Sequence, residues 1–340
     1  MVEDLIITKS GKINDYLHLI DVKAYGTQRM LSVFLGEFDE GSVLLECGSS
    51  LDIKNVLRYF KKHNVSLSSF KYLITTHHHF DHNGGLWKLY NVLKKHNPNV
   101  KILTNTITKE LLNDFEHHMK RGSRTYGNLT GVMKPIEDSA FQIIEPSTLD
   151  NIEIIDTFHI EGSEVRLCII QTPGHTPDHQ SPAFLKDNDL DFIHYGEAMG
   201  TIYHRSKLLS MPTSMPIYFN YDKYMKTLES LRNTIPIKAG FGHFGLVQGK
   251  ENVQTLLLEH KSFMKTFREK IDEFYNEKPE TKYVLEKIKP FINPRTDLSI
   301  DNNPVLNGIT LGIVYGMLVS LGYRSISEEE LYYYNKFYSL

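Results

Sequence analysis

The first half of the chain alternates short apolar runs with longer segments whose apolar residues recur at helical spacing. Runs of the first kind are typical of buried strands, and spacing of the second kind is typical of helices packed on one face. The apolar runs predict strands at residues 42–46, 71–75 and 100–104. The helical spacing predicts helices at residues 52–63, 84–96 and 107–120. This alternating order predicts an α/β sandwich in which helices cover sheets.

Residues 121–136 interrupt this alternation with a segment rich in Gly, Ser, Thr and Asn. Such a composition is typical of a long surface loop. Two interpretations stay open: a loop that caps a site, or a tolerated surface insertion.

The second half returns to strand-like runs and then changes to long helices. Strands are predicted at residues 152–158, 164–171, 190–195 and 237–239, with a helix at 222–233. Beyond residue 250 the pattern predicts helices at 251–276, 281–289, 311–321 and 327–337, separated by breakers at Pro290, Pro294, Asn302, Asn303 and Pro304. We therefore divide the chain into a domain of residues 1–249 and a helical C-terminal extension of residues 250–340. The aromatic-rich extension is expected to dock on the core.

Composition places the chain among globular proteins with an ordinary core. Hydrophobic residues make up 41% and charged residues 23%, which is typical of that class. The net charge of −3 gives no overall positive field for nucleic acid or an anionic membrane. No apolar run reaches the roughly 18 residues of a membrane span. We expect a small-molecule substrate, no membrane partner and no nucleic acid, and a homodimer stays open as an assembly.

The two cysteines, Cys47 and Cys168, both lie in apolar runs. We expect them to be buried thiols in a reducing compartment rather than a disulfide. The first residues lack the charged and apolar pattern of a signal peptide. Both features predict a cytoplasmic protein.

Candidate chemistry is concentrated in the run from His77 to His82, which reads His-His-His-Phe-Asp-His and follows the apolar residues 72–74. Imidazole nitrogens and carboxylate oxygens are ligands that Zn²⁺ and Fe²⁺ prefer. Side chains alternate along an extended chain, so His77 and His79 would face one ion while His78 points away. Asp81 and His82, just past the bend, would face a second ion.

Three later residues complete a set of the size that two metal ions need. His175 follows a predicted strand in Thr-Pro-Gly-His, Glu197 follows another in Gly-Glu, and His243 stands between glycines. Each of these signals is weak when taken singly. Their combination with the six-residue motif predicts a metal centre.

The four motifs, in this order, resemble those of the metallo-β-lactamase superfamily over roughly residues 1–250. The resemblance implies a four-layer αββα sandwich, a metallo-β-lactamase-like catalytic domain at 1–249, and a dinuclear site at one edge. It implies one ion held by His77, His79 and His175, and a second held by Asp81, His82 and His243, with Glu197 either bridging the two ions or contacting one of them. Two divalent ions are expected, zinc first, with iron or manganese as alternatives.

Two residues depart from the usual pattern of the superfamily. Glu197 stands where aspartate usually bridges the metals, and Glu46 stands where an early strand usually ends in aspartate. The longer carboxylates leave a mononuclear or iron-tuned site open. Glu46 would orient a loop through hydrogen bonds behind the ligands.

The resulting hypothesis is a metal-dependent hydrolase, similar to glyoxalase II-like and lactonase-like members. A metal-bridging hydroxide would attack an ester, thioester, lactone or phosphodiester, with Asp81 as both ligand and candidate catalytic residue. A non-haem di-iron protein that binds dioxygen is an alternative, although His79 stands where those members usually have Glu. A nucleic-acid phosphodiesterase is another, given the basic residues Lys120, Arg121, Arg124 and Lys134.

Other histidines and tyrosines have weaker signals. His179 is either a hydrogen-bond partner behind the ligands or a surface residue. Three further histidines have no motif around them, and we expect them to be structural or exposed: His117, His118 and His159. Residues that could serve as proton donors but more often pack as aromatics are Tyr203, His204, Tyr218 and Tyr221.

Overall fold

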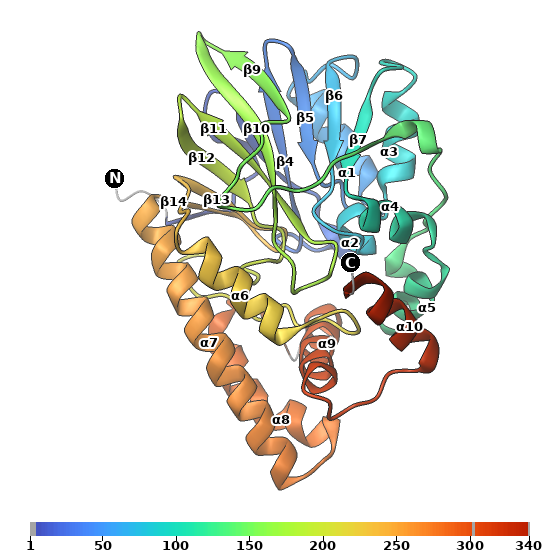
Figure 1. The fold of residues 1–340 in the computed structure, drawn as a ribbon, viewed down its shortest axis with the longest axis vertical. Coiled ribbons are helices and arrows are strands. Elements are labelled where there is room, and N and C mark those ends of the chain that lie inside the picture. The colour runs from blue at the N-terminus through green and yellow to red at the C-terminus, as the bar shows by residue number, and fades with distance from the viewer. Residues whose placement is uncertain (1–4, 301–302, 339–340) are drawn as a thin grey trace.

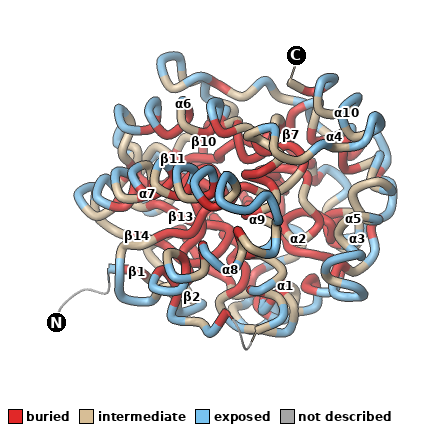
Figure 2. Tube along the Cα trace, turned by 90° about the horizontal axis from the view of Figure 1, so that it is seen from below, coloured by how far each residue is buried: buried red, intermediate tan, exposed pale blue. Residues whose placement is uncertain are grey.

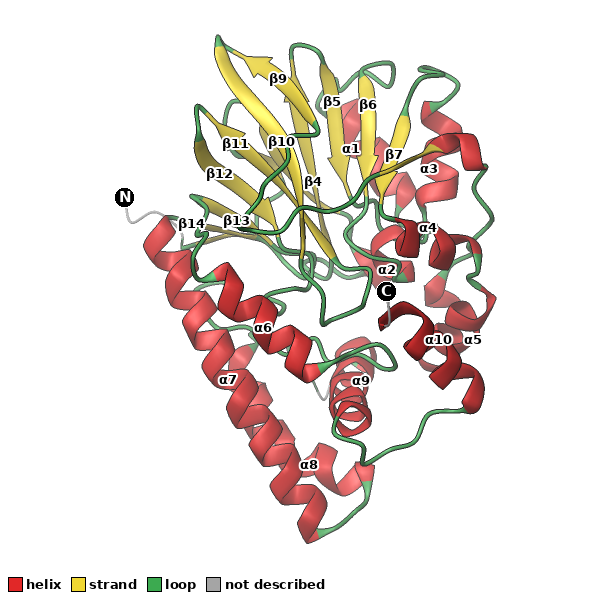
Figure 3. Cartoon of the chain, in the orientation of Figure 1, coloured by secondary structure: helices red, strands yellow, loops and turns green. Residues whose placement is uncertain are grey.

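The computed structural model describes residues 5–300 and 303–338 and contains two seven-stranded sheets packed face to face. Helices cover the outer face of each sheet (Figures 1 and 3), so the expected αββα sandwich is confirmed. One sheet has the strand order β2-β3-β4-β5-β6-β7-β8, and the other has the order β1-β14-β13-β12-β11-β10-β9.

The first sheet is antiparallel from β2 to β5 and parallel from β5 to β8. Its strands are β2 (Gly11–Lys12), β3 (Leu17–Asp21), β4 (Ser32–Phe38), β5 (Gly41–Leu45), β6 (Phe70–Ile74), β7 (Lys101–Thr104) and β8 (Phe141–Ile143). Three of these strands match the predicted runs. The sequence pattern did not identify β3 and β4, of which β4 lies next to β5 in the sheet and β3 lies on the other side of β4.

The second sheet is antiparallel except for the pair β12–β13. Its strands are β1 (Ile6–Ile7), β9 (Asp156–Ile160), β10 (Ser163–Gln171), β11 (Gln180–Lys186), β12 (Asp189–His194), β13 (Lys238–Gly240) and β14 (Leu246–Gln248). The strand predicted at 152–158 begins later, at Asp156. β11 was missed because Pro182 within it weakens the strand signal.

Side-chain alternation along the strands builds two apolar layers. In β4, Phe34 packs between the sheets, whereas Val33 and Leu35 face the outer layer of helices. In β10, Leu167 faces the partner sheet and Cys168 faces outward. Each central strand is therefore buried on both faces, as the red strand segments in Figure 2 show. Cys168 and Cys47 are both free and buried, as expected.

The helices of the first half surround the ends of the strands. They are α1 (Ile53–Lys62), α2 (Phe80–Asn83), α3 (Leu86–Leu93), α4 (Thr106–Asn113) and α5 (Glu116–Tyr126). The single helix expected at 107–120 is divided in two at Asp114 and Phe115. The prediction of a loop at 121–136 is wrong for its first part, because α5 continues to Tyr126. The Tyr126 ring stacks on Tyr25 at a centroid distance of 5.5 Å.

The remaining helices are α6 (Tyr221–Leu231), α7 (Lys250–Glu277), α8 (Thr281–Ile292), α9 (Pro304–Ser320) and α10 (Glu328–Tyr338). Pro290 lies inside α8 and does not end it. Pro304 does not separate helices either: it occupies the first turn of α9, where proline is well tolerated, and the Asn303 side chain caps that turn.

The C-terminal helices dock on the core as expected. Leu256 and Leu257 of α7, together with Ile313 and Met317 of α9, belong to the same apolar cluster as Tyr203 of the first part of the chain. Figure 1 shows α7 beginning beside β14 at the edge of the second sheet and running past α6 away from the sandwich. None of the described helices has both the length and the apolar composition needed to cross a bilayer.

Candidate metal centre

The expected ligands come together where several strands end at one edge of the sandwich. His77, His79, Asp81 and His82 follow β6, while His175 follows β10. Glu197 follows β12, and His243 lies in the turn between β13 and β14. The sheet pairings bring these ends together, so residues from position 77 to position 243 share one site.

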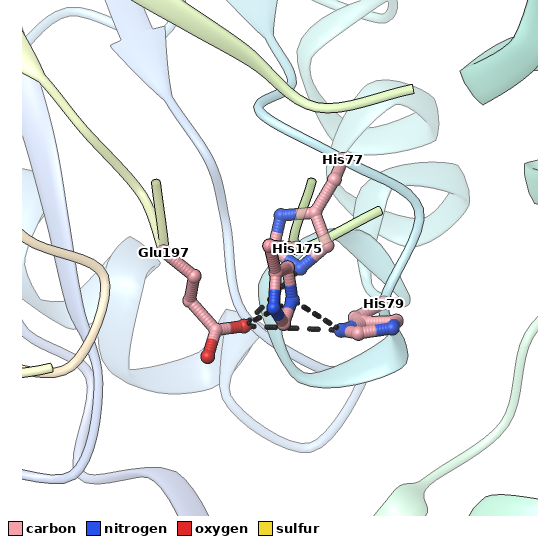
Figure 4. Close-up of side chains that lie close together, drawn as sticks. All are labelled: His77, His79, His175 and Glu197. Atoms are coloured by element: carbon pink, nitrogen blue, oxygen red, sulfur yellow. Dashed lines mark hydrogen bonds and ion pairs between the residues drawn. The ribbon is translucent and has the colours of Figure 1, made fainter. Parts of the chain in front are cut away.

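The first group of ligands surrounds one oxygen of Glu197. Its Oε2 atom lies 2.8 Å from His175 Nε2, 3.4 Å from His77 Nε2 and 3.8 Å from His79 Nδ1. Figure 4 shows the three imidazole rings converging on this oxygen from different directions. The four residues could hold one cation, because their ligand atoms all lie within 4.8 Å of one another.

The second group consists of Asp81, His82 and His243, whose ligand atoms are equally close together. His82 Nε2 lies 3.0 Å from His243 Nε2, which in turn lies 3.4 Å from Asp81 Oδ2. His82 Nε2 also lies 3.3 Å from Glu197 Oε2. Glu197 therefore stands between the two groups, and the grouping agrees with the one that the resemblance implied.

The hydrogen bonds behind the rings test whether these groups suit cations. His243 Nδ1 donates to the Met30 carbonyl oxygen, and His82 Nδ1 lies 2.9 Å from a Glu46 carboxylate oxygen. Burial alone would lower the pKa of His82, but Glu46 and Asp81 raise it well above its usual value. A proton on His82 Nε2 can therefore be replaced by a cation. Each ring then keeps one N–H on Nδ1, directed at Glu46 or at the Met30 carbonyl, and both Nε2 lone pairs are available to bind the cation. The donor set therefore fits a divalent metal ion with nitrogen and oxygen ligands.

Glu46 lies behind the second group of ligands, in contact with His82. Its carboxylate contacts His82, the Thr76 hydroxyl and His194, whose Nε2 lies 3.0 Å away. Burial alone would raise the pKa of Glu46, but His82 and His194 hold it well below its usual value. His194 was missed in the sequence, although its place at the end of β12, three residues before Glu197, was a usable signal.

His179 and His78 take different places around the first group. The Glu197 backbone N–H donates to His179 Nε2 at 3.1 Å, and His179 Nδ1 lies 2.8 Å from the Thr172 hydroxyl. His179 is thus buried behind the ligands, where it accepts a hydrogen bond. His78 lies outside the ligand groups, as expected, with Nδ1 3.0 Å from Asp178.

The carboxylates of the site are held in the ionised form. Burial alone would raise the pKa of Asp81, but His82 and His243 outweigh burial and hold this pKa well below its usual range. Glu197 shows the same balance, with His175 as the main cause of the lowered pKa. The Tyr25 hydroxyl donates to Asp81 Oδ2 at 3.0 Å and orients that carboxylate.

A cavity of about 470 Å³ opens beside both groups. The predicted ligands on its wall are His79, Asp81, Glu197 and His243. Tyr203 also lines the cavity, and its buried hydroxyl has no hydrogen-bond partner among the described residues. Tyr218 lines a smaller neighbouring cavity instead, while Tyr221 packs against Arg268 at 4.6 Å from the ring centroid.

His118 lies closer to the site than the sequence indicated. Its ring stacks parallel to His79 at a centroid distance of 5.4 Å and lines the main cavity. The backbone N–H of Phe80 donates to His118 Nε2 at 3.1 Å. This bond leaves Nδ1 as the nitrogen that carries the proton in the neutral ring, so His118 is a hydrogen-bond donor in the cavity wall.

The chain is similar to known proteins of one superfamily. The sequence model described as "Metallo-beta-lactamase superfamily" matches residues 27–190, which include the His77–His82 motif and His175. The metallo-beta-lactamase fold-containing protein ST1585 of Sulfurisphaera tokodaii is 28% identical over 221 residues, or 63% of this chain and 77% of that protein.

Solved structures share the fold over nearly the whole chain. The crystal structure of ST1585 matches with a TM-score of 0.58 and 22% identity, covering 92% of this chain and all of that one. TTHA1429 from Thermus thermophilus, a metallo-beta-lactamase family protein, matches with a TM-score of 0.59 and 14% identity, covering 92% of this chain and 94% of that one. The helical extension makes up little more than a quarter of the chain. An alignment that covers 92% of the chain therefore includes most of this extension.

Proposed function

The chain belongs to the metallo-beta-lactamase superfamily, and from this premise we propose that it is a metal-dependent hydrolase of an ester, thioester or lactone. The observation that carries the proposal is the pair of facing nitrogen atoms in His82 and His243, 3.0 Å apart, beside a cavity open to a substrate. His77, His79, His175 and Glu197 would hold one ion, and Asp81, His82 and His243 a second. Bound divalent cations would supply Lewis acidity that activates water at neutral pH.

Side chains of the protein would transfer the proton and stabilise the acyl oxygen. Asp81, ionised and oriented by Tyr25, accepts a proton from the attacking water and returns it to the departing oxygen or sulfur. The Tyr203 hydroxyl and the His118 Nδ1–H, both in the cavity wall, donate hydrogen bonds to the acyl oxygen as negative charge develops on it. Water thereby adds across the acyl C–O or C–S bond and yields a carboxylic acid and an alcohol or thiol.

The basic residues near α5 give little support to a nucleic-acid phosphodiesterase. Arg121 forms an ion pair with Glu330, and Lys134 lies over the Trp87 ring at 4.9 Å. Both of these cations have partners within the fold, whereas binding of a polyphosphate chain depends on several free cations.

The proposal is tested by measuring bound metal and hydrolysis on the same samples. Protein purified without chelators should contain about two equivalents of a divalent metal by elemental analysis and should hydrolyse p-nitrophenyl acetate. His243→Ala should lower the metal content to about one equivalent and reduce kcat/KM by roughly a hundredfold or more. Iron with a visible absorption band in air would instead favour the di-iron alternative.

The control is His159→Ala, which removes an exposed histidine that pairs with Glu40. It should change neither the metal content nor the rate. Wild-type protein that folds but retains no zinc, iron or manganese when these are supplied would overturn the proposal.

A further inference from the structure

The cavity beside the candidate metal centre has apolar as well as polar walls. Helix α9 contributes apolar side chains and two glycines to its wall: Gly308, Ile309, Leu311, Gly312 and Ile313. Opposite them stand Gly122, Thr125 and Tyr126 of α5. The cavity wall thus includes, besides the metal ligands, a stretch along α9 that would contact a hydrocarbon group.

Glycine on α9 keeps this space open. A Cβ atom at Gly308 would lie 3.4 Å from Thr125 Cγ2 and 3.5 Å from Tyr126 Cε1, which is ordinary contact. One at Gly312 would lie 2.8 Å from the end of the Met215 side chain. Glycine inside a helix lowers the stability of the helix relative to alanine, so the two together indicate that the room beside this face of α9 is used.

Few charges face the cavity beyond the ligands. Arg121 is neutralised by Glu330, which also lines the wall. Arg124 is exposed at the surface and makes no ion pair within residues 5–300 and 303–338. A volume of about 470 Å³ falls within the range of roughly 300–1,000 Å³ typical of small-molecule sites.

From these walls we infer that the space between α5 and α9 is an acyl-binding site, and that the substrate is an ester or thioester with an apolar acyl group of medium length. The inference rests on the proposed function for the reacting bond, but the binding site itself does not require turnover. The acyl chain lies along Gly308 and Gly312 with its carbonyl carbon beside Asp81 and Glu197. Burial of each methylene there should strengthen binding about threefold to fourfold.

The inference is tested first by binding of the carboxylate products. Acetate, butanoate and octanoate are titrated into the full-length, metal-loaded protein by calorimetry. All three present the same carboxylate, so differences among them report the apolar part alone. Octanoate should bind at least tenfold more tightly than butanoate, with a negative heat-capacity change that marks apolar burial.

A Cβ atom at Gly308 makes only ordinary contacts, so Gly308→Leu extends a side chain into the site and should weaken octanoate binding at least tenfold. Asn307→Leu adds a similar side chain to the exposed neighbouring position, which does not line the cavity, and should leave binding unchanged. Equal affinity for the three carboxylates, or equal effects of the two variants, would overturn the acyl-binding site.

Hydrolysis of p-nitrophenyl acetate, butanoate and octanoate is then measured on the same proteins. The ratio of kcat/KM for octanoate to that for acetate should exceed ten in the wild type and fall toward one in Gly308→Leu. Selective octanoate binding without hydrolysis of any ester would retain the binding site and reject the hydrolase. Hydrolysis with no dependence on chain length would retain the hydrolase and reject the acyl-binding site.

Discussion

Glu46 combines a left-handed backbone with complete burial of a charged side chain. Its φ angle is 65°, in a region where residues other than glycine are uncommon. Its carboxylate contacts His82, His194 and Thr76. A strained backbone and a buried charge persist only where the surrounding structure fixes them, and such residues are concentrated at functional sites. Glu46 therefore sets the orientation and the ligand strength of His82.

Replacing Glu46 by glutamine should weaken metal binding more than it weakens the fold. The amide keeps the shape of the side chain but removes the negative charge that draws the His82 Nδ1 proton. Loss of such a partner typically lowers metal affinity about 10–100-fold. Competition with a chromogenic chelator measures this change, and circular dichroism monitors the fold.

The matched control is Glu37→Gln. Glu37 also pairs with a histidine, His18, at 2.9 Å, but on a part of the sheet outside the metal-binding groups. It should leave the metal affinity unchanged. Equal affinities in the wild type and Glu46→Gln would show that Glu46 has no influence on the ligand.

Helix α7 contacts the metal centre through a chain of hydrogen bonds. His260 Nε2 lies 2.8 Å from the Tyr224 hydroxyl, which accepts a bond from the Gly200 N–H at 2.8 Å. Thr213 continues the chain: its hydroxyl donates to the Glu197 carbonyl at 3.0 Å, and its own carbonyl accepts from His175 Nδ1 at 2.6 Å. The helical extension thus supports the loops that carry two predicted ligands.

His260 should make the protein less stable as the pH falls. Burial lowers the pKa of His260 to about 3, whereas an unfolded histidine has a pKa of about 6.5. Below pH 6.5 the unfolded chain binds the extra proton, so the free energy of unfolding falls until the pH reaches the folded pKa. The loss from this residue alone is roughly 2.5 kcal/mol between pH 7 and pH 4.5.

Urea denaturation of the wild type and His260→Gln at several pH values measures this effect. The stability curves should converge as the pH falls from 7 to 4.5, because glutamine does not titrate there and contributions shared by both proteins cancel. Curves that stay parallel would show that the pKa of His260 is the same in the folded and unfolded states.

Elements with strong local patterns were predictable, and those fixed by distant contacts were not. Helix α1 and strand β10 agree with their predicted ranges within a residue at each end. The extension of α5 through Gly122 to Tyr126 depends on partners far away in the chain, Tyr25 and Glu330. Local propensity carries no information about such contacts, so a Gly- and Ser-containing segment has the sequence signature of a loop.

The same distinction holds for the site. His77 to His82 were predictable as a group because one strand end presents them together. Glu46 and His118 reach the site through the packing of β5 beside β6 and of α5 against α2. The position of His118 follows from tertiary structure, and no spacing in the sequence encodes it, whereas the family resemblance was needed to expect Glu46 behind the ligands.

At the scale of the whole molecule, the helical extension is part of the core rather than an appendage. Helix α7 buries Leu256, Leu257 and Met264 completely. Helix α9 buries Val314 and Met317, and the Ser214 hydroxyl donates to the Ile313 carbonyl. Each buried side chain of this size contributes about 1.5–3 kcal/mol to stability. The free energy of burial lost with the extension therefore exceeds the net free energy of unfolding of a typical domain.

Truncation after Gly249 should therefore give an aggregated protein, whereas truncation after Arg324 should give a soluble, folded one. The shorter deletion keeps the Arg324 hydrogen bonds to Thr281 and Tyr275 and removes α10. Helix α10 buries Phe337 against Leu111, Ile217 and Tyr218 and otherwise makes polar contacts such as those from Tyr333 to Asp114 and from Lys336 to Glu110. Size-exclusion chromatography and thermal unfolding distinguish the two products. A monomeric, cooperatively unfolding protein after the longer deletion would show that residues 1–249 fold independently, and the stability contributed by α7 and α9 would then be small.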